Sequence, residues 1–393
     1  MTKNRMLALF LSFLLVASLA GCGAAQPAQP QKPTEGEKVI RIGLVSPLSG
    51  SVAYYGGLMR DGAAMAIKEI NDAGGLELGG KKFKIDLKVE DDRGSPSDSV
   101  NAVEKLTTQD KVTAVIGSYL STATLANLAV TEKYGLVQIT PVSVADAITK
   151  GHPYMFRNVA NQTMQTVQNA EWVAKNTNFK NVAMFLSNDD YGREGGRIWK
   201  ETFEKDGGKV VDTAYFNLGD TEFTSQLTKI KAKNPDAIFL VALITEGSQI
   251  IKQARDLGMN QTFIGLGGFA SDKFLELVKG TAEGMIHNSY WEPDPKNPKS
   301  MEYKDKFVKF SGKEAEMFGA AAYDAAYIVT EAMKRVGEFP MQDKVYQQKL
   351  REAMLKTDYL GVQGRTTFDA NGQANMRVYI VKIINGKRTI VGP

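Results

Sequence analysis

The chain is poor in the side chains that form disulfides or bind transition metals. Its 393 residues include one cysteine, Cys22, and two histidines, His152 and His287. A single cysteine excludes a disulfide within the chain. The histidines are far apart and lack the spacing of metal ligands, so we expect surface or hinge residues and no metal site. After the N-terminal segment no apolar run approaches the roughly 18 residues of a transmembrane helix, which excludes a later membrane span.

The sequence signatures of common enzymes are also missing. There is no GxSxG elbow, no Walker loop and no GxGxxG after a strand, and the glycine-rich segment 265–268 lacks the third glycine. The acidic cluster 90–92 lacks the alternating oxygen ligands of a calcium loop. We therefore expect neither catalysis nor a cofactor, because an exported hydrolase would need a nucleophile and a base. Lys and Arg are spread along a chain of net charge +4, which does not indicate a nucleic-acid partner.

The first residues have the composition of an export signal. A short basic start precedes the apolar stretch Met6–Ala20, which ends in Leu19-Ala20-Gly21-Cys22. This ending resembles the lipobox of bacterial lipoproteins, which implies that residues 1–21 are removed and that Cys22 is lipidated. The alternative is an ordinary secretory signal with an incidental cysteine. Residues 22–37, rich in Ala, Gln, Pro and Gly, are predicted to be a flexible tether, so we expect an extracytoplasmic protein anchored to the cell membrane by lipid.

The rest of the chain, residues 38–393, exceeds the usual size of one core and reads as alternating strands and helices. This alternation predicts an α/β fold with parallel sheets covered by helices on both faces. The pattern restarts near residue 181, which indicates two similar lobes. Residues 300–357 are predicted to be almost wholly helical, and residues 361–391 to form a hairpin with turns at Asn371-Gly372 and Asn385-Gly386. The predicted strands lie within 40–50, 83–92, 112–118, 136–142, 181–190, 209–216, 236–243 and 261–268.

An ordered set of short motifs extends over residues 38–390. They are IGL (42–44), PLSG (47–50), YG (55–56), GA (62–63), INDAGG (70–75), DD (91–92), VIGS (115–118), ST (121–122), ITP (139–141) and NDDYG (188–192). Together they resemble the branched-chain amino acid binding proteins of ABC transporters, which have the periplasmic binding protein type 1 fold. The resemblance implies two Rossmann-like lobes joined by three crossovers near 157–160, 287–290 and 361–367. Lobe 1 would comprise 38–158 and 289–364, lobe 2 would comprise 159–288 and 365–393, and the ligand would bind between them.

The predicted ligand site begins at a helix N-terminus. Ser121 and Thr122 follow a predicted strand and open a helix, where backbone N–H groups and the helix dipole favour an anion. The resemblance places the ligand carboxylate on Ser121. A plain N-cap is the alternative role for this pair. Tyr55 and Tyr191 match aromatic positions of the family's pocket, although either could be a packing tyrosine.

The resemblance also implies a receptor for the ligand's amine, and here the sequence departs from the family. The loop that receives the amine corresponds to residues 141–144, but the family's threonine is replaced by Val144, its tyrosine by Leu243 and its glutamate by Gly267. A buried ammonium without polar partners is costly. We therefore predict a small apolar carboxylate as ligand, or a branched-chain amino acid whose amine contacts Ser143, Asp190 or Glu246. The predicted ligand-binding residues are Tyr55, Leu120, Ser121, Thr122, Val142, Ser143, Val144, Tyr191, Leu243 and Gly267.

Two functions fit these features. The first is capture of a small solute for the membrane permease subunits of an ABC importer. The alternative is a ligand-sensing receptor subunit with the same fold, because both functions need only a form that closes around the ligand.

Overall fold

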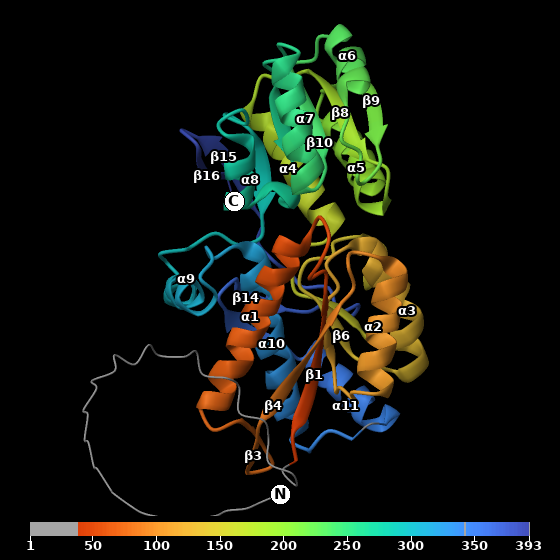
Figure 1. Cartoon of the computed structure of the whole chain (residues 1–393), viewed down its shortest axis with the longest axis vertical. Coiled ribbons are helices and arrows are strands. Elements are labelled where there is room, and N and C mark those ends of the chain that lie inside the picture. The colour runs from red at the N-terminus through yellow and green to blue at the C-terminus, as the bar shows by residue number, and fades with distance from the viewer. Residues whose placement is uncertain (1–37, 342, 393) are drawn as a thin grey trace, which may run out of the picture. The chain divides into compact units, whose positions relative to one another are not determined.

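The structure is a computed structural model that describes residues 38–341 and 343–392. The predicted signal peptide (1–21), the lipidation site Cys22 and the tether (22–37) lie outside the described residues. Within the described residues, no helix combines the length and the apolar character needed to cross a membrane. Two sheets organise this part of the chain, and we call each sheet with the helices packed on it a lobe (Figure 1).

Lobe 1, in the lower half of Figure 1, is built on a five-stranded sheet in which every neighbouring pair is parallel. In spatial order the strands are β4 (Ile85–Asp91), β1 (Ile40–Ser46), β5 (Val115–Ile116), β6 (Gln138–Thr140) and β7 (Met155–Arg157). The helices are α1 (Ala53–Asp72), α2 (Pro96–Thr108), α3 (Ser121–Tyr134), α9 (Pro298–Ser311), α10 (Met317–Val336) and α11 (Lys344–Leu355). The predicted helical block over residues 300–357 is therefore confirmed by α9, α10 and α11.

Apolar residues on both faces of β1 explain why helices cover both faces of this sheet. Ile42 and Leu44 belong to the core formed with α1 and α10, whereas Val45 belongs to the core formed with α2 and α3. The helices α1 and α10 approach so closely that a Cβ atom on Gly62 would lie 2.1 Å from the carbonyl oxygen of Gly319. Only glycine permits this backbone contact, which fixes α10 and its N-terminus against α1.

Lobe 2 is built on a seven-stranded sheet. In spatial order the strands are β16 (Lys387–Gly392), β15 (Tyr379–Ile384), β12 (Ile286–Ser289), β11 (Thr262–Gly265), β10 (Ala237–Val241), β8 (Asn181–Ser187) and β9 (Lys209–Phe216). The pairs from β12 to β9 are parallel, but β15 pairs antiparallel with both β12 and β16, so the prediction of a parallel sheet is wrong at this edge. The predicted turn at Asn385-Gly386 is present and joins β15 to β16. Both residues have the positive φ that a tight hairpin turn requires, 52° and 70° respectively.

The remaining elements are the helices of lobe 2 and several short elements of both lobes. The helices packed on the second sheet are α4 (Gln162–Asn176), α5 (Asp190–Lys205), α6 (Thr224–Ala232), α7 (Ile244–Asp256) and α8 (Asp272–Val278). Short elements are η1 (Asp146–Ile148), η2 (Gly267–Phe269) and the two-stranded pairs β2 (Leu76–Leu78) with β3 (Lys81–Phe83), and β13 (Asp358–Gly361) with β14 (Gly364–Thr367). This architecture confirms the predicted α/β fold class.

The chain passes between the two lobes three times. The passages follow β7, β12 and β14, and the first two begin where the sequence predicts them. The third passage, between β14 and β15, lies later than the predicted residues 361–367, which mostly belong to the β13–β14 hairpin. This hairpin is held to α10 because the Asp324 carboxylate accepts the N–H groups of Val362 and Gln363, both at 2.9 Å. His287 is fully buried on β12, directly before the second passage. Of the two positions predicted for the histidines, surface or hinge, His287 therefore occupies the hinge.

Candidate functional site

A cavity lies where the carboxyl ends of the strands in both sheets face each other. Residues of both lobes line it, which is the usual position of a ligand in doubly wound α/β folds. Nine of the ten predicted ligand-binding residues line this cavity: Leu120, Ser121, Thr122, Val142, Ser143, Val144, Tyr191, Leu243 and Gly267. The lining residues that the prediction omits are Tyr119, Asp189, Gly268, Tyr290, Met317 and Phe318.

The N-terminus of α3 forms the polar end of the lobe 1 wall. Leu120 occupies the N-cap position and makes no side-chain capping bond, so Ser121 is the first helical residue. The N-cap alternative for Ser121 is therefore wrong. Its Oγ instead accepts the N–H groups of Val144 and Ala145, both at 3.3 Å, and so positions the neighbouring loop. A helix start without a side-chain cap leaves its first backbone N–H groups available to a ligand anion.

The loop that follows β6 offers the cavity an apolar surface and a hydroxyl that is already bonded. Val142 and Val144 line the cavity. The Ser143 hydroxyl lies 2.6 Å from the Thr124 hydroxyl and donates to the carbonyl oxygens of Ser118 and Tyr119 at 3.0 Å. Ser143 would have to give up these contacts to receive an amine.

The two carboxylates predicted as substitute amine receptors do not line the cavity. Asp190 is exposed at the start of α5, and Glu246 is buried with its Oε1 accepting the N–H of Gly219. Asp189 lines the cavity instead, because α5 begins one residue after it. Its Oδ1 caps α5 by accepting the N–H of Gly192 at 2.8 Å and also accepts the Ser187 hydroxyl at 2.8 Å. Asp189 is therefore the one acidic residue on the described cavity wall, and a structural role already occupies one of its oxygens.

Aromatic rings form much of the apolar wall, although not through Tyr55. That residue is fully buried behind the wall, where its ring stacks on Tyr119 and packs against Phe318 at centroid distances of 5.6 and 4.5 Å. The Tyr55 hydroxyl donates to the carbonyl oxygen of Gly268 in lobe 2 at 3.4 Å. The prediction that Tyr55 lines the pocket is thus wrong. Tyr119 and Phe318 line the cavity, and Tyr55 packs behind them.

The tyrosines that line the cavity are neutral hydrogen-bonding groups. Burial raises the pKa of Tyr119 and of Tyr191 well above the ordinary value, and raises the pKa of Tyr290 to about 12. The Tyr290 hydroxyl donates to Oε1 of Gln165 at 3.2 Å. These groups can contact an apolar ligand with the ring and a polar ligand atom with the hydroxyl.

Comparison with known proteins places the chain among solute-binding proteins. The family model described as periplasmic binding protein matches residues 39–388. A leucine-, isoleucine-, valine-, threonine- and alanine-binding protein of Pseudomonas aeruginosa is 27% identical over 85% of this chain and 86% of its own length. The Leu/Ile/Val-binding protein BraC3 of Rhizobium johnstonii is 30% identical over 76% of this chain and 80% of its own length. The crystal structure of the branched-chain amino acid transporter substrate binding protein LivJ of Streptococcus pneumoniae with isoleucine has a TM-score of 0.82 and 30% identity, covering 91% of this chain and all of LivJ.

Proposed function

Because the chain belongs to the periplasmic binding protein family, among the branched-chain amino acid binding proteins of ABC transporters, we propose that it is the solute-binding component of an ABC importer. In this role it captures a branched-chain amino acid or a similar small apolar carboxylate outside the cytoplasm and delivers it to membrane permease subunits. One observation supports this most strongly: the uncapped start of α3 and a largely apolar, aromatic wall face the same cavity between two lobes.

The cavity offers different chemistry to the two ends of such a ligand. The ligand carboxylate would accept the first N–H groups of α3 and the hydroxyl hydrogen of Ser121, whose oxygen already accepts two N–H groups. The apolar part of the ligand would lie among Leu243, Phe318 and the ring of Tyr191. Residues of both lobes would therefore contact one small molecule, so ligand binding favours the arrangement in which the lobes are closed.

We expect the lobes to close when ligand binds, because the three chain passages act as a hinge. A thermal-shift screen of amino acids against aliphatic and aromatic carboxylates would first identify a ligand. Small-angle scattering should then show a smaller radius of gyration at saturating ligand than in its absence. A radius that stays the same at saturation would contradict capture by hinge closure.

We also propose that Cys22 is the lipidated N-terminus of the mature protein. The sequence Leu19-Ala20-Gly21-Cys22 after the apolar stretch supports this, as does the absence of any other cysteine from the chain. Mass spectrometry of the mature protein should find a diacylglycerol thioether on Cys22, and Cys22→Ser should abolish the modification. An unmodified N-terminus downstream of Cys22 would show that the chain is secreted without an anchor.

A further inference from the structure

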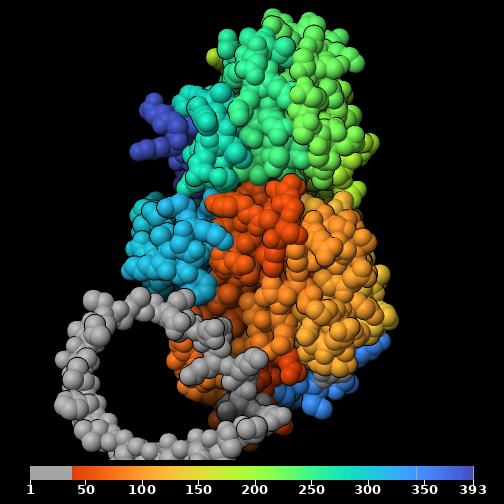
Figure 2. Space-filling view, in the orientation of Figure 1, coloured from red at the N-terminus to blue at the C-terminus, as the bar shows by residue number. Residues whose placement is uncertain are grey.

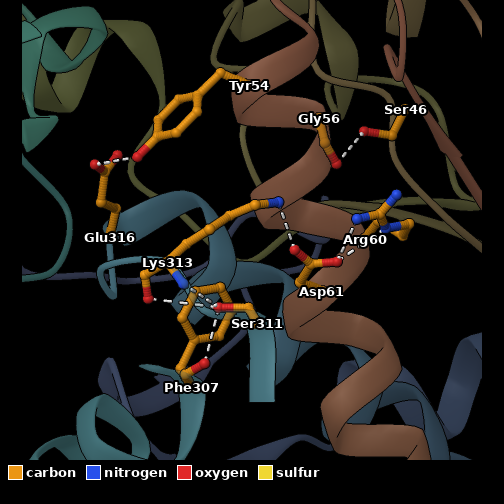
Figure 3. A network of polar contacts seen from close by, with 9 residues as sticks. All are labelled: Ser46, Tyr54, Gly56, Arg60, Asp61, Phe307, Ser311, Lys313 and Glu316. Atoms are coloured by element: carbon orange, nitrogen blue, oxygen red, sulfur yellow. Dashed lines mark hydrogen bonds and ion pairs between the residues drawn. The ribbon is translucent and has the colours of Figure 1, made fainter. Parts of the chain in front are cut away.

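A buried carboxylate links the two lobes beside the cavity. Glu316 directly precedes α10 in lobe 1, and its side chain makes no capping bond to its own helix. Its Oε1 instead accepts the Ser271 hydroxyl at 3.2 Å and the N–H of Asp272 at 3.0 Å, both at the start of α8 in lobe 2. The same oxygen accepts the Tyr54 hydroxyl of α1 at 2.9 Å (Figure 3). One oxygen atom thus receives hydrogen bonds from both lobes, at a position that is fully buried.

This link lies next to the proposed ligand site. Met317 and Phe318, the two residues after Glu316, line the cavity, and Gly268 lines it three residues before Ser271. Figure 2 shows atoms of the two lobes in contact across their junction on one face of the molecule. Separation of the lobes would break the bonds from Ser271 and Asp272 and would expose the Glu316 carboxylate to water, while the bond from Tyr54 could remain.

The charged groups around Glu316 do not provide it with an ion pair. Arg388 of β16 is the nearby cation, but its guanidinium lies 3.2 Å from Asp272 and 3.8 Å from Glu292, which itself follows β12. On the α1 side, Lys313 bonds to Asp61 at 2.7 Å rather than to Glu316 (Figure 3). Glu276 of α8 also lies near Tyr54, but it is paired with Lys273 of the same helix at 2.8 Å. The carboxylates of Glu316, Asp272 and Glu292 therefore share the single guanidinium of Arg388, an arrangement that favours a neutral Glu316.

Two observations indicate that the closed junction accommodates a protonated carboxyl group. Burial raises the pKa of Glu316 to about 7, despite the opposing effects of Arg388 and of the hydrogen bonds. The second oxygen, Oε2, is buried and has no partner among the described residues, so it can carry a proton without breaking a contact. A glutamate exposed by opening would have the ordinary pKa of about 4.3. The closed form thus binds a proton more tightly than the open form.

We propose that Glu316 is an interlobe latch that couples proton uptake to closure of the lobes, so that solute affinity rises as the pH falls from 8 to 6. The proposal rests on the proposed function, because it concerns closure around a captured solute. The closed form has the raised Glu316 pKa, so it is stabilised relative to the open form at a pH below that pKa. This stabilisation is lost as the pH rises through the pKa, and solute affinity falls with it. With values of about 7 in the closed form and about 4.3 in the open form, affinity should increase about tenfold between pH 8 and pH 6.

The test compares the wild-type protein with Glu316→Gln. Glutamine keeps an oxygen that accepts the three donors, and it is neutral at every pH, so it imitates the protonated latch. Calorimetry with leucine and with 4-methylpentanoate at pH 6 and pH 8 should give the tenfold change for the wild type. It should give tight, pH-independent binding for Glu316→Gln. Glu316→Ala should bind weakly at both pH values because the contact between lobes is lost.

The control is Glu314→Gln, which removes an exposed carboxylate two residues earlier in the same loop and should retain the wild-type pH dependence. Small-angle scattering of the ligand-free protein gives a second readout that needs no ligand. The wild type should be more compact at pH 6 than at pH 8, and Glu316→Gln should be compact at both. If solute binds but neither affinity nor compactness of the wild type changes with pH, the latch is wrong while the proposed function stands. If neither solute binds and the screen finds no other, the proposed function fails. The scattering of the ligand-free protein at pH 6 and pH 8 then decides alone whether Glu316 couples protonation to closure.

Discussion

Replacement of Ser121 by aspartate is expected to abolish solute binding. The new carboxylate would lie at the first residue of α3, on the cavity wall where the ligand carboxylate is proposed to bind. Two negative charges about 4 Å apart repel each other by about 4 kcal/mol at an effective dielectric constant of 20. This energy corresponds to a loss of affinity of roughly a thousandfold. Calorimetry with the tightest ligand from the thermal-shift screen would measure it.

Two variants separate this repulsion from a folding defect. Aspartate at position 121 can still accept the N–H groups of Val144 and Ala145, so the melting temperature should change little. Ser97→Asp adds the same charge to the first turn of α2, at an exposed position outside the cavity, and should bind normally. Ser121→Ala should lose about 1.5–3 kcal/mol, the value of a hydrogen bond to a charged group. Binding by Ser121→Asp within tenfold of wild type would show that the carboxylate binds elsewhere.

The second large effect on affinity is expected when the ligand, rather than the protein, is changed. Removal of the ligand's carboxylate charge should cost more than about a hundredfold in affinity, whereas removal of its amine should cost less than tenfold. The positions that would receive an amine are Val144, Leu243 and Gly267, and the Ser143 hydroxyl is held by its own contacts. A buried ammonium would therefore lack partners at these four positions. Calorimetry with leucine, 4-methylpentanoate and leucinamide compares the three cases on one isobutyl side chain.

A strong preference for leucine over 4-methylpentanoate would contradict this expectation and would point to one residue as the receptor for the amine. If leucine binds at least tenfold tighter than 4-methylpentanoate, a difference of about 1.4 kcal/mol, the amine has a partner in the cavity. Asp189 is then the residue responsible, because it is the acidic side chain on the described wall. Asp189→Asn should in that case reduce the affinity for leucine and leave the affinity for 4-methylpentanoate unchanged.

Much of the fold could be predicted because its signals are local. The strands are short apolar runs, and β8 (Asn181–Ser187) is buried at every position but its first. Glycines end several helices, as Gly135 does for α3 with a left-handed φ of 64°. The antiparallel edge of the second sheet escaped prediction, because alternation shows that β15 and β16 form a hairpin but not which strand that hairpin joins.

The site was predictable where its residues follow strands directly. Ser121, Val144 and Tyr191 lie in loops or helix starts at the carboxyl ends of β5, β6 and β8, and this edge of a parallel sheet forms the cavity. Tyr119 lies in the same loop as Leu120 and could have been included on that ground. Asp189 was missed in favour of Asp190, because the predicted strand extends to residue 190, whereas β8 ends at Ser187 and Asp189 is the N-cap of α5.

The rest of the site depends on long-range packing that no local pattern reveals. Phe318 reaches the cavity from the first turn of α10, about two hundred residues after Ser121, because α10 packs against α1. The same packing buries Tyr55 and so converts an expected wall residue into its support. The contact of Glu316 with Ser271 likewise exists only once both lobes are assembled.

A crystal structure of the protein with its tightest ligand would test the central claim most directly. We predict that the ligand carboxylate oxygens lie about 2.7–3.2 Å from the backbone nitrogens at the start of α3, with the Ser121 hydroxyl as a further donor. The apolar part of the ligand should lie between Tyr191 and Phe318. A ligand outside this cavity, or a carboxylate directed toward lobe 2 and away from α3, would contradict the account.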